Sequence, residues 1–194
     1  MGVTSYKKRA KLAFLDKTNS VFWVAIGGTS AWPNESAPPS AAPGDPGMDE
    51  PICYVKPQTI SLCKLVDTDE DVIHKGNKYK FIADVNAVTE DARFIYLFAR
   101  FDPTVGQPYA NFRQVAVYDG LTPVAGHEND LWLAPSNVDN PGQWEYLDND
   151  VVTTMTSSRI QVIELVVEIS NRHLGHCICN FVSTGNKKIA GYSC

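Results

Sequence analysis

Four residues near the end of the chain have side chains of the kinds that bind transition metals: His173, His176, Cys177 and Cys179. Zinc takes about four nitrogen and sulfur ligands in a tetrahedron. In an extended segment both thiols would point to the same side. However, Cys-x-Cys is not the usual Cys-x₂₋₄-Cys spacing, and no second pair lies nearby in the sequence. We therefore favour buried thiols with surface histidines, and zinc binding or cysteine pairing are the alternatives.

A second group of ligand types lies in an acidic segment, where Asp67, Asp69 and Asp71 match the first three ligand positions of a calcium-binding loop. Such a loop needs a glycine next, for its sharp turn, and a bidentate glutamate at its end. This chain has Val72 and Lys78 at those positions. The pattern therefore favours a solvated acidic turn over a calcium site.

The sequence contains no arrangement that is typical of an enzyme. Segment Gly28-Thr29-Ser30-Ala31 lacks the closing glycine of a G-x-S-x-G nucleophile elbow. No phosphate-binding loop or dinucleotide fingerprint is present, and no carboxylate pair of the glycosidase kind can be singled out. We predict a protein without enzymatic activity, without catalytic or metal-binding residues and without a cofactor. The alternative is a metal-dependent enzyme built on the cluster from His173 to Cys179.

Length and composition indicate one domain, residues 1–194, of which 44% are hydrophobic and 20% charged. The net charge of −5 argues against general binding to nucleic acid or membrane surfaces. No apolar run is long enough to span a membrane, and the N-terminus does not have the pattern of a signal peptide. The odd number of cysteines then favours reduced thiols in a cytoplasm. The five are Cys53, Cys63, Cys177, Cys179 and Cys194.

The N-terminal residues 5–17 are expected to form a short amphipathic helix, capped by Ser5. Its first turn contains Lys7, Lys8 and Arg9, and positive charges there oppose the helix dipole. This basic turn is either a patch that meets an acidic neighbour or a solvated face.

Short apolar runs separated by turn residues predict a mainly β, antiparallel, sandwich-like fold. The run 93–101 predicts a strand buried on both faces. In the strand 160–169, four alternate residues are expected to line the core: Ile163, Leu165, Val167 and Ile169. Further strands are expected at 21–26, 52–66 with a break at Pro57, 78–83, 112–118, 144–147 and 177–183, with turns at 76–77 and 148–150 and an irregular segment at 121–141.

Residues 28–51 form a segment rich in proline and glycine that cannot adopt regular structure. Loops of this length are typically functional or disordered, and we predict an interaction arm. Because Trp32 precedes Pro33, its backbone is steered to an extended conformation. We expect a structural corner with a packed Trp32 ring; the alternative is a carbohydrate- or receptor-binding module that stacks sugars on tryptophans. The residues selected as structural or interaction anchors are Trp32, Pro33, Asn34, Glu35, Trp132 and Trp144.

Three segments, in this order along the chain, resemble the baseplate wedge proteins of contractile-tailed bacteriophages, of the T-even gene-eight type. In residues 22–39 a strand is followed by Ile-Gly, Trp-Pro-Asn-Glu and a proline-rich stretch. Residues 111–117 read NFRQVAV. Residues 142–169 contain an aromatic-Tyr-Leu-Asp-Asn block, a polar spacer and a final apolar strand. The C-terminal extension 171–194 goes beyond the resemblance.

The resemblance implies a structural protein of the phage virion, a baseplate wedge subunit in a shortened form. Such a subunit would be assembled in the cytoplasm of the host, would form a homodimer within a wedge and would bind neighbouring baseplate or tail proteins. We expect no nucleic-acid, membrane or small-molecule partner. A neck or tail adaptor elsewhere in the virion is the variant of this hypothesis, and the cysteines could pair after the particle leaves the cell.

Overall fold

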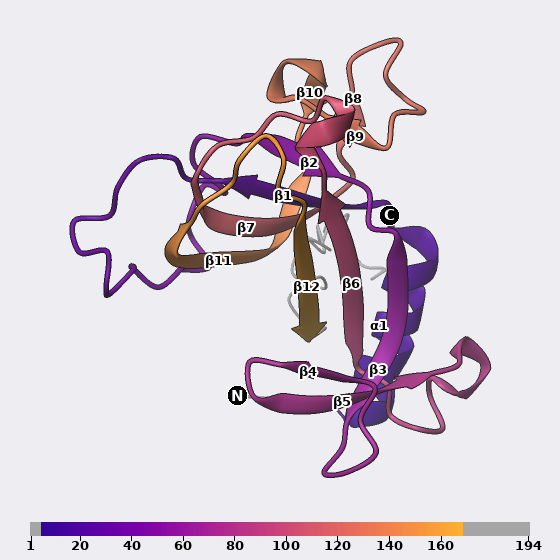
Figure 1. The fold of residues 1–194 in the computed structure, drawn as a ribbon. Helices are drawn as coiled ribbons and strands as arrows, with labels where there is room; N and C mark the ends of the chain where they lie inside the picture. Colours follow the sequence, from indigo (N-terminus) through magenta and orange to yellow (C-terminus); the bar gives the residue numbers. More distant parts are fainter. Residues whose placement is uncertain (1–4, 169–194) are drawn as a thin grey trace, which may run out of the picture.

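The computed structural model of the protein describes residues 5–168 (Figure 1). These residues form two five-stranded antiparallel sheets, a small two-stranded sheet and one N-terminal α-helix. In Figure 1 the strands of one large sheet run across those of the other, as in an orthogonal β-sandwich. The predicted mainly β, sandwich-like fold with one N-terminal helix is confirmed.

The first large sheet, called here the β1 sheet, has the strand order β11-β7-β1-β2-β9. β1 (Phe22–Gly27) lies at its centre and pairs with β2 (Cys53–Val55) and β7 (Phe112–Asp119). All six residues of β1 are buried, because both faces of this sheet are covered. Its two edge strands are β11 (Gln143–Thr153) and β9 (Trp132–Leu133).

The second large sheet, the β6 sheet, has the order β12-β6-β3-β5-β4. β6 (Phe94–Phe101) is buried on both faces over most of its length, as predicted. It pairs with β12 (Gln161–Glu168) and with β3 (Thr59–Leu65). Pro57 separates β2 from β3, so the expected break in residues 52–66 is also confirmed.

A hairpin completes the β6 sheet; the sequence predicted its second strand, at residues 78–83, but not its first. Its strands are β4 (Val72–His74) and β5 (Asn77–Ile82). The two residues between them, Lys75 and Gly76, have φ angles of 47° and 79°, and positive φ at both positions is typical of a two-residue hairpin turn. The turn that we placed at residues 76–77 therefore lies one residue earlier.

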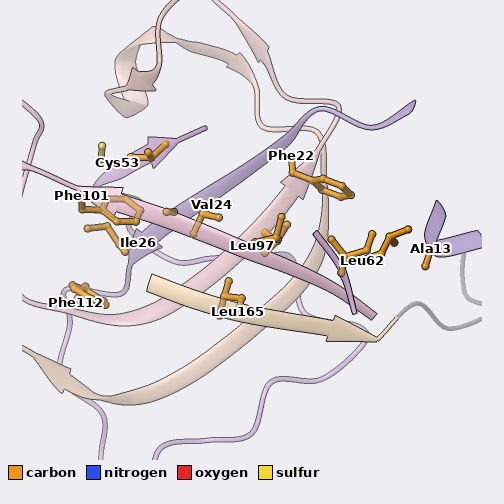
Figure 2. Close-up of a cluster of buried hydrophobic side chains, with 14 of the residues drawn as sticks. Ala13, Phe22, Val24, Ile26, Cys53, Leu62, Leu97, Phe101, Phe112 and Leu165 are labelled. Carbon is orange, nitrogen blue, oxygen red and sulfur yellow. The ribbon is translucent and has the colours of Figure 1, made fainter. Parts of the chain in front are cut away.

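The main core lies between the two large sheets (Figure 2). Leu165 of β12 is 4% exposed and contacts this core, and Ile163 and Val167 pack against it. The predicted inward face of β12 is thus confirmed for these three residues, whereas Ile169 lies outside the described part of the chain. Other members of the core come from β1, β3 and β6, among them Val24, Ile26, Leu62, Leu97 and Phe101.

Helix α1 (Tyr6–Asn19) packs beside β3 and β6 and begins at the predicted cap, where the Ser5 hydroxyl accepts a hydrogen bond from the Lys8 amide. Ala10 and Ala13 are its buried residues. Tyr6 is 56% exposed, and the guanidinium of Arg93 lies 4.0 Å from the centre of its ring.

Two expectations for residues 121–153 are wrong. The segment 121–141 is not wholly irregular: Leu133 pairs with Tyr54 of β2, and two short strands pair with each other. Residues 148–150 do not form a turn, because β11 continues through them to Thr153. Register shifts interrupt its pairing with β7, and β11 continues as one strand beyond them. The remaining short elements are β8 (Thr122–Pro123), β10 (Val138–Asn140) and the 3₁₀ turns η1 (Asp84–Asn86), η2 (Pro103–Val105) and η3 (Pro135–Asn137).

Two of the five cysteines lie in the described residues, and both are free, fully buried thiols. They are Cys53 of β2 and Cys63 of β3. Burial raises the pKa of each thiol to about 12, so both stay protonated and unreactive in the folded protein.

Candidate interaction surface

The segment Gly28–Pro51, called here the arm, leaves the end of β1 and returns to the start of β2. Figure 1 shows it as the violet loop that extends away from the sheets on the left. Its two ends lie side by side, because the Gly28 amide donates to the Asp49 carbonyl at 2.7 Å and the Ile52 amide donates to the Ile26 carbonyl at 2.8 Å. The arm is therefore closed at its base.

The base of the arm packs tightly on the sheet. A Cβ atom at Gly27 would lie 2.5 Å from the sulfur of Met48, so only glycine allows the two segments to approach this closely. Met48 packs against the cluster on the outer face of the β1 sheet. Its amide donates to the Tyr118 hydroxyl at 3.1 Å, and the next amide, of Asp49, donates to the Gln114 side chain at 2.7 Å. Two side chains of β7 thus accept hydrogen bonds from backbone amides of the arm, in place of the carbonyl groups of a paired strand.

The residues Trp32 to Glu35 form a compact corner fixed on β7. The Glu35 carboxylate accepts from the Trp32 amide and binds Arg113 of β7, with an N–O distance of 2.9 Å. A second nitrogen of Arg113 donates to the Thr29 carbonyl at 2.7 Å. The hydrogen bond from Arg113 lowers the pKa of Glu35, so this carboxylate stays charged and the pair persists at neutral pH.

The other two residues of the corner lie on its outside. Pro33 and Asn34 are exposed, and the Asn34 side chain accepts from the amide and hydroxyl of Ser36. The bonds between Asn34 and Ser36 close the turn locally, and Pro33 faces solvent.

Two tryptophans fasten the arm to edge strand β11. The half-buried Trp32 donates from its indole nitrogen to the Asp150 carbonyl at 2.9 Å. The half-buried Trp144 of β11 donates in the opposite direction, to the Asp45 carbonyl of the arm, at 3.1 Å. The Asn149 side chain adds a bond to the Pro39 carbonyl at 2.9 Å. Both indole N–H groups are therefore used to fix the backbone.

A carboxylate at the base of the arm makes a third set of bonds. Glu50, at a φ of 44°, accepts from the Thr29 hydroxyl and from the amide and hydroxyl of Ser30. These bonds, led by those from the two hydroxyls, lower the pKa of Glu50 to about 2. The first and last turns of the arm are thus joined by one ionised side chain.

The third selected tryptophan lies elsewhere. Trp132 belongs to β9, at the edge of the β1 sheet opposite to β11, and packs partly against the main core. It lines an open cleft of about 600 Å³ together with side chains from β2, β6 and the loops beside them. The structure therefore groups Trp32 and Trp144 around the arm and places Trp132 apart from them. The other side chains of this cleft include Gln58, Arg100, Gln107, Asn129 and Leu131.

Several residues that hold the arm were not selected from the sequence. Arg113, Gln114 and Tyr118 of β7 and Glu50 of the arm itself make its main polar contacts. A signal for two of them was present, since Arg113 and Gln114 fall within the NFRQVAV segment. Their role depends on contacts between residues far apart in the chain, which spacing alone does not reveal.

The residues considered for metal binding are placed as follows. In the acidic segment, Asp69 binds Lys80 at 2.6 Å and the Asp71 carboxylate accepts from the Phe81 amide at 2.7 Å, as expected of a turn held by its neighbours. Within residues 5–168, no three side chains of metal-binding type are gathered. The group His173, His176, Cys177 and Cys179 lies outside the described residues, as does the strand expected at 177–183. No helix of the described part is long and apolar enough to cross a membrane.

Comparison with known proteins adds two findings. A sequence model of the family described as "baseplate wedge 3 tail fiber network component" matches residues 1–169. "Virion protein 3" of Enterococcus phage phiEF24C is 29% identical over 168 residues, which make up 84% of this chain and 91% of that protein. Residues 171–194, which we regarded as an extension, lie beyond the family match.

Proposed function

The chain belongs to the family of baseplate wedge and tail fibre network components, a family of phage structural proteins, and from this premise we propose that it is a wedge subunit of the tail baseplate that binds itself and neighbouring baseplate proteins. The family match over residues 1–169 is the observation that carries the proposal. Its role would be mechanical: it would hold neighbouring subunits in position by means of its exposed loops.

The arm supports this proposal, because its contacts order it before any partner arrives. Hydrogen bonds made by six side chains fix it to β7 and β11, yet most of residues 36–46 stay exposed. A loop that is already ordered loses less conformational entropy on binding, so more of its contact energy appears as affinity. The exposed part is rich in proline and small residues, which can lie flat against a neighbouring surface.

The proposal is tested on phage particles. Purified tails should contain the chain, and a cryo-EM map of the baseplate should place the arm against a neighbouring subunit. Replacing Pro38, Pro39 and Pro43 by glycine should reduce the amount of the chain in purified baseplates, whereas Val85→Ser, at a side chain 88% exposed and far from the arm in sequence, should not. Absence of the chain from purified baseplates would contradict the proposal, and a position in the neck would favour the adaptor variant.

The cleft beside Trp132 favours a second candidate function, carbohydrate or receptor binding. An aromatic ring next to amide and guanidinium groups is the arrangement that stacks and hydrogen-bonds a sugar. A glycan array probed with the isolated chain tests this candidate. Binding that is lost in Trp132→Ala and kept in Trp32→Ala would support it, because only Trp132 lines the cleft. No binding to any glycan would remove it.

A further inference from the structure

The exposed side of α1 carries an unbalanced positive charge. The helix contains five basic residues and one acidic residue, in a protein whose net charge is −5. Lys7, Lys8 and Lys11 are exposed and fall on the same side as Leu15, at the spacing of neighbours on a helix surface. No acidic residue occupies the first turn, so its lysines face the positive end of the helix dipole. This arrangement weakens the isolated helix and calls for a negative partner.

The chain itself does not provide that partner. Among the described residues, Arg9 of the helix binds Glu168 at 2.7 Å and Lys17 binds Asp84, but none of the ion pairs involves Lys7, Lys8 or Lys11. Residues 169–194 contain three basic side chains and no aspartate or glutamate. Residues 1–4 contain no acidic side chain either. A carboxylate that binds these three lysines would therefore come from another molecule.

A matching negative surface exists on the same protein. Residues 20–168 contain 21 acidic and nine basic residues, and the acidic excess includes the arm and strand β11. These two segments hold seven acidic and no basic residues. Two cations from elsewhere in the chain bind them: Arg113 pairs with Glu35, and Lys75 pairs with Asp148. The seven are Glu35, Asp45, Asp49, Glu50, Glu145, Asp148 and Asp150.

The two charged surfaces cannot meet within one molecule. In Figure 1, α1 lies at the right of the sandwich, and the arm extends from its left side. In a pair related by a two-fold axis, however, contact of one helix with the partner's arm is matched by the reverse contact. Complementary charge of this kind steers association and fixes its orientation.

We propose that the exposed basic side of α1 docks against the acidic surface of the arm and β11 in a second copy of this chain. The docking rests on the proposed self-association and assigns a surface to it. In the dimer, the attraction between the lysines of the first turn and the partner's carboxylates would offset their unfavourable interaction with the helix dipole. The proline-rich tip of the arm would remain available to contact other baseplate proteins.

The test is the oligomeric state of the full chain, measured by analytical ultracentrifugation at a concentration of about 100 μM. We expect a dimer at about 50 mM NaCl that weakens at least about tenfold at about 500 mM, because salt screens exposed charges. The variant Lys7→Glu/Lys8→Glu/Lys11→Glu should be monomeric, as should Asp49→Lys/Asp150→Lys. The helix variant should still fold, because acidic residues suit the first turn of a helix.

A mixture of the two charge-reversed variants provides the decisive measurement. Each has lost self-association, but in the mixture the glutamates of the helix variant can meet the two lysines of the arm variant. The unchanged helix lysines of the arm variant can in turn meet the unchanged carboxylates of the helix variant. Equal amounts should therefore form a heterodimer. The matched control Asp67→Lys/Asp139→Lys changes two exposed carboxylates outside the surface and should dimerise like the parent.

Each result has a definite meaning. A parent that is monomeric at low salt, or a dimer unaffected by salt and by both reversals, would overturn the inference. A monomeric parent would also remove self-binding from the proposed function. The place of the chain in the baseplate is tested separately, by its presence in purified baseplates.

Discussion

Strand β1 and the arm follow one another directly in the chain but are held in place by different forces. All six residues of β1 are buried, and it is fixed by apolar packing and by ladders to β2 and β7. The arm buries little of its own surface and is fixed by individual polar bonds from side chains such as Arg113 and Trp144. The stabilisation of β1 is shared among many apolar contacts, whereas a single substitution can remove one of the few polar bonds that hold the arm.

This difference indicates which part of the protein can change conformation. Loss of a core contact should lower the stability of the whole domain, while loss of an arm contact should release the arm and leave the sandwich folded. Opening free energies that vary between parts of one domain are common, and binding segments are drawn from the less stable parts. The following predictions test this contrast, from the largest expected effect to the smallest.

Leu165→Ala should reduce the free energy of unfolding by about 2–5 kcal/mol, because Leu165 is buried opposite Leu97 in the main core and truncation leaves a cavity. Thermal and urea unfolding measure the change. Val162→Ala on the same strand, at a side chain 42% exposed, is the control and should cost much less. Equal stability of Leu165→Ala and the parent would show that β12 does not contribute to the core as described.

Trp32→Ala should cost about 1–3 kcal/mol, less than a core tryptophan, since the ring is half-buried and loses one hydrogen bond to the Asp150 carbonyl. Trp32→Phe keeps an aromatic ring but loses the N–H and part of the apolar contact of the indole, so its cost should lie between those of the parent and Trp32→Ala. Melting temperatures and the rate of arm cleavage check both variants. A melting temperature and a cleavage rate equal to those of the parent would show that the Trp32 ring does not hold the corner.

Arg113→Gln should leave the melting temperature nearly unchanged but speed proteolysis of the arm by about tenfold, because it removes charge-assisted bonds to Glu35 and to the Thr29 carbonyl. In the parent, cleavage should also fall within the arm and should slow when partners bind. Arg159→Gln, at an exposed site, is the matched control. Cleavage outside residues 28–51 would contradict the contrast between arm and core.

Acidification should loosen the base of the arm through Glu50. Its pKa in the folded protein, about 2, lies below its ordinary value of 4.5, so its contribution is complete above about pH 4.5 and is lost as the pH falls towards 2. Hydrogen exchange of the Ser30 amide, which donates to this carboxylate, measures the effect. In Glu50→Gln the protection should be lower at neutral pH and should not change in this window, and an identical pH profile in both proteins would rule out Glu50 as the cause.

The sequence predicted most of the core and little of what holds the arm. Strands β6, β7 and β12 follow from local apolar runs, because burial of a strand leaves a regular pattern in the chain itself. The arm was recognised as a loop from its prolines, but its attachment depends on pairs such as Asn149 and Pro39, which are 110 residues apart. Such pairs have no local pattern.

The same reason explains why the turn prediction in β11 was wrong and why strand β4 was not predicted. Asp148, Asn149 and Asp150 have the composition of a turn, yet pairing with β7 and bonds to the arm keep them in a strand. β4 is only three residues long and becomes a strand through its pairing with β5. Tertiary pairing decides such short segments, and local propensity does not.

The two buried thiols have a consequence for the durability of the particle outside the cell. A cysteine is oxidised as its thiolate and in proportion to its access to oxidants, and burial denies Cys53 and Cys63 both conditions. They should therefore survive exposure to air for as long as the sandwich remains closed. Alkylation of these two residues, followed by mass spectrometry of stored particles, would record how often the domain opens.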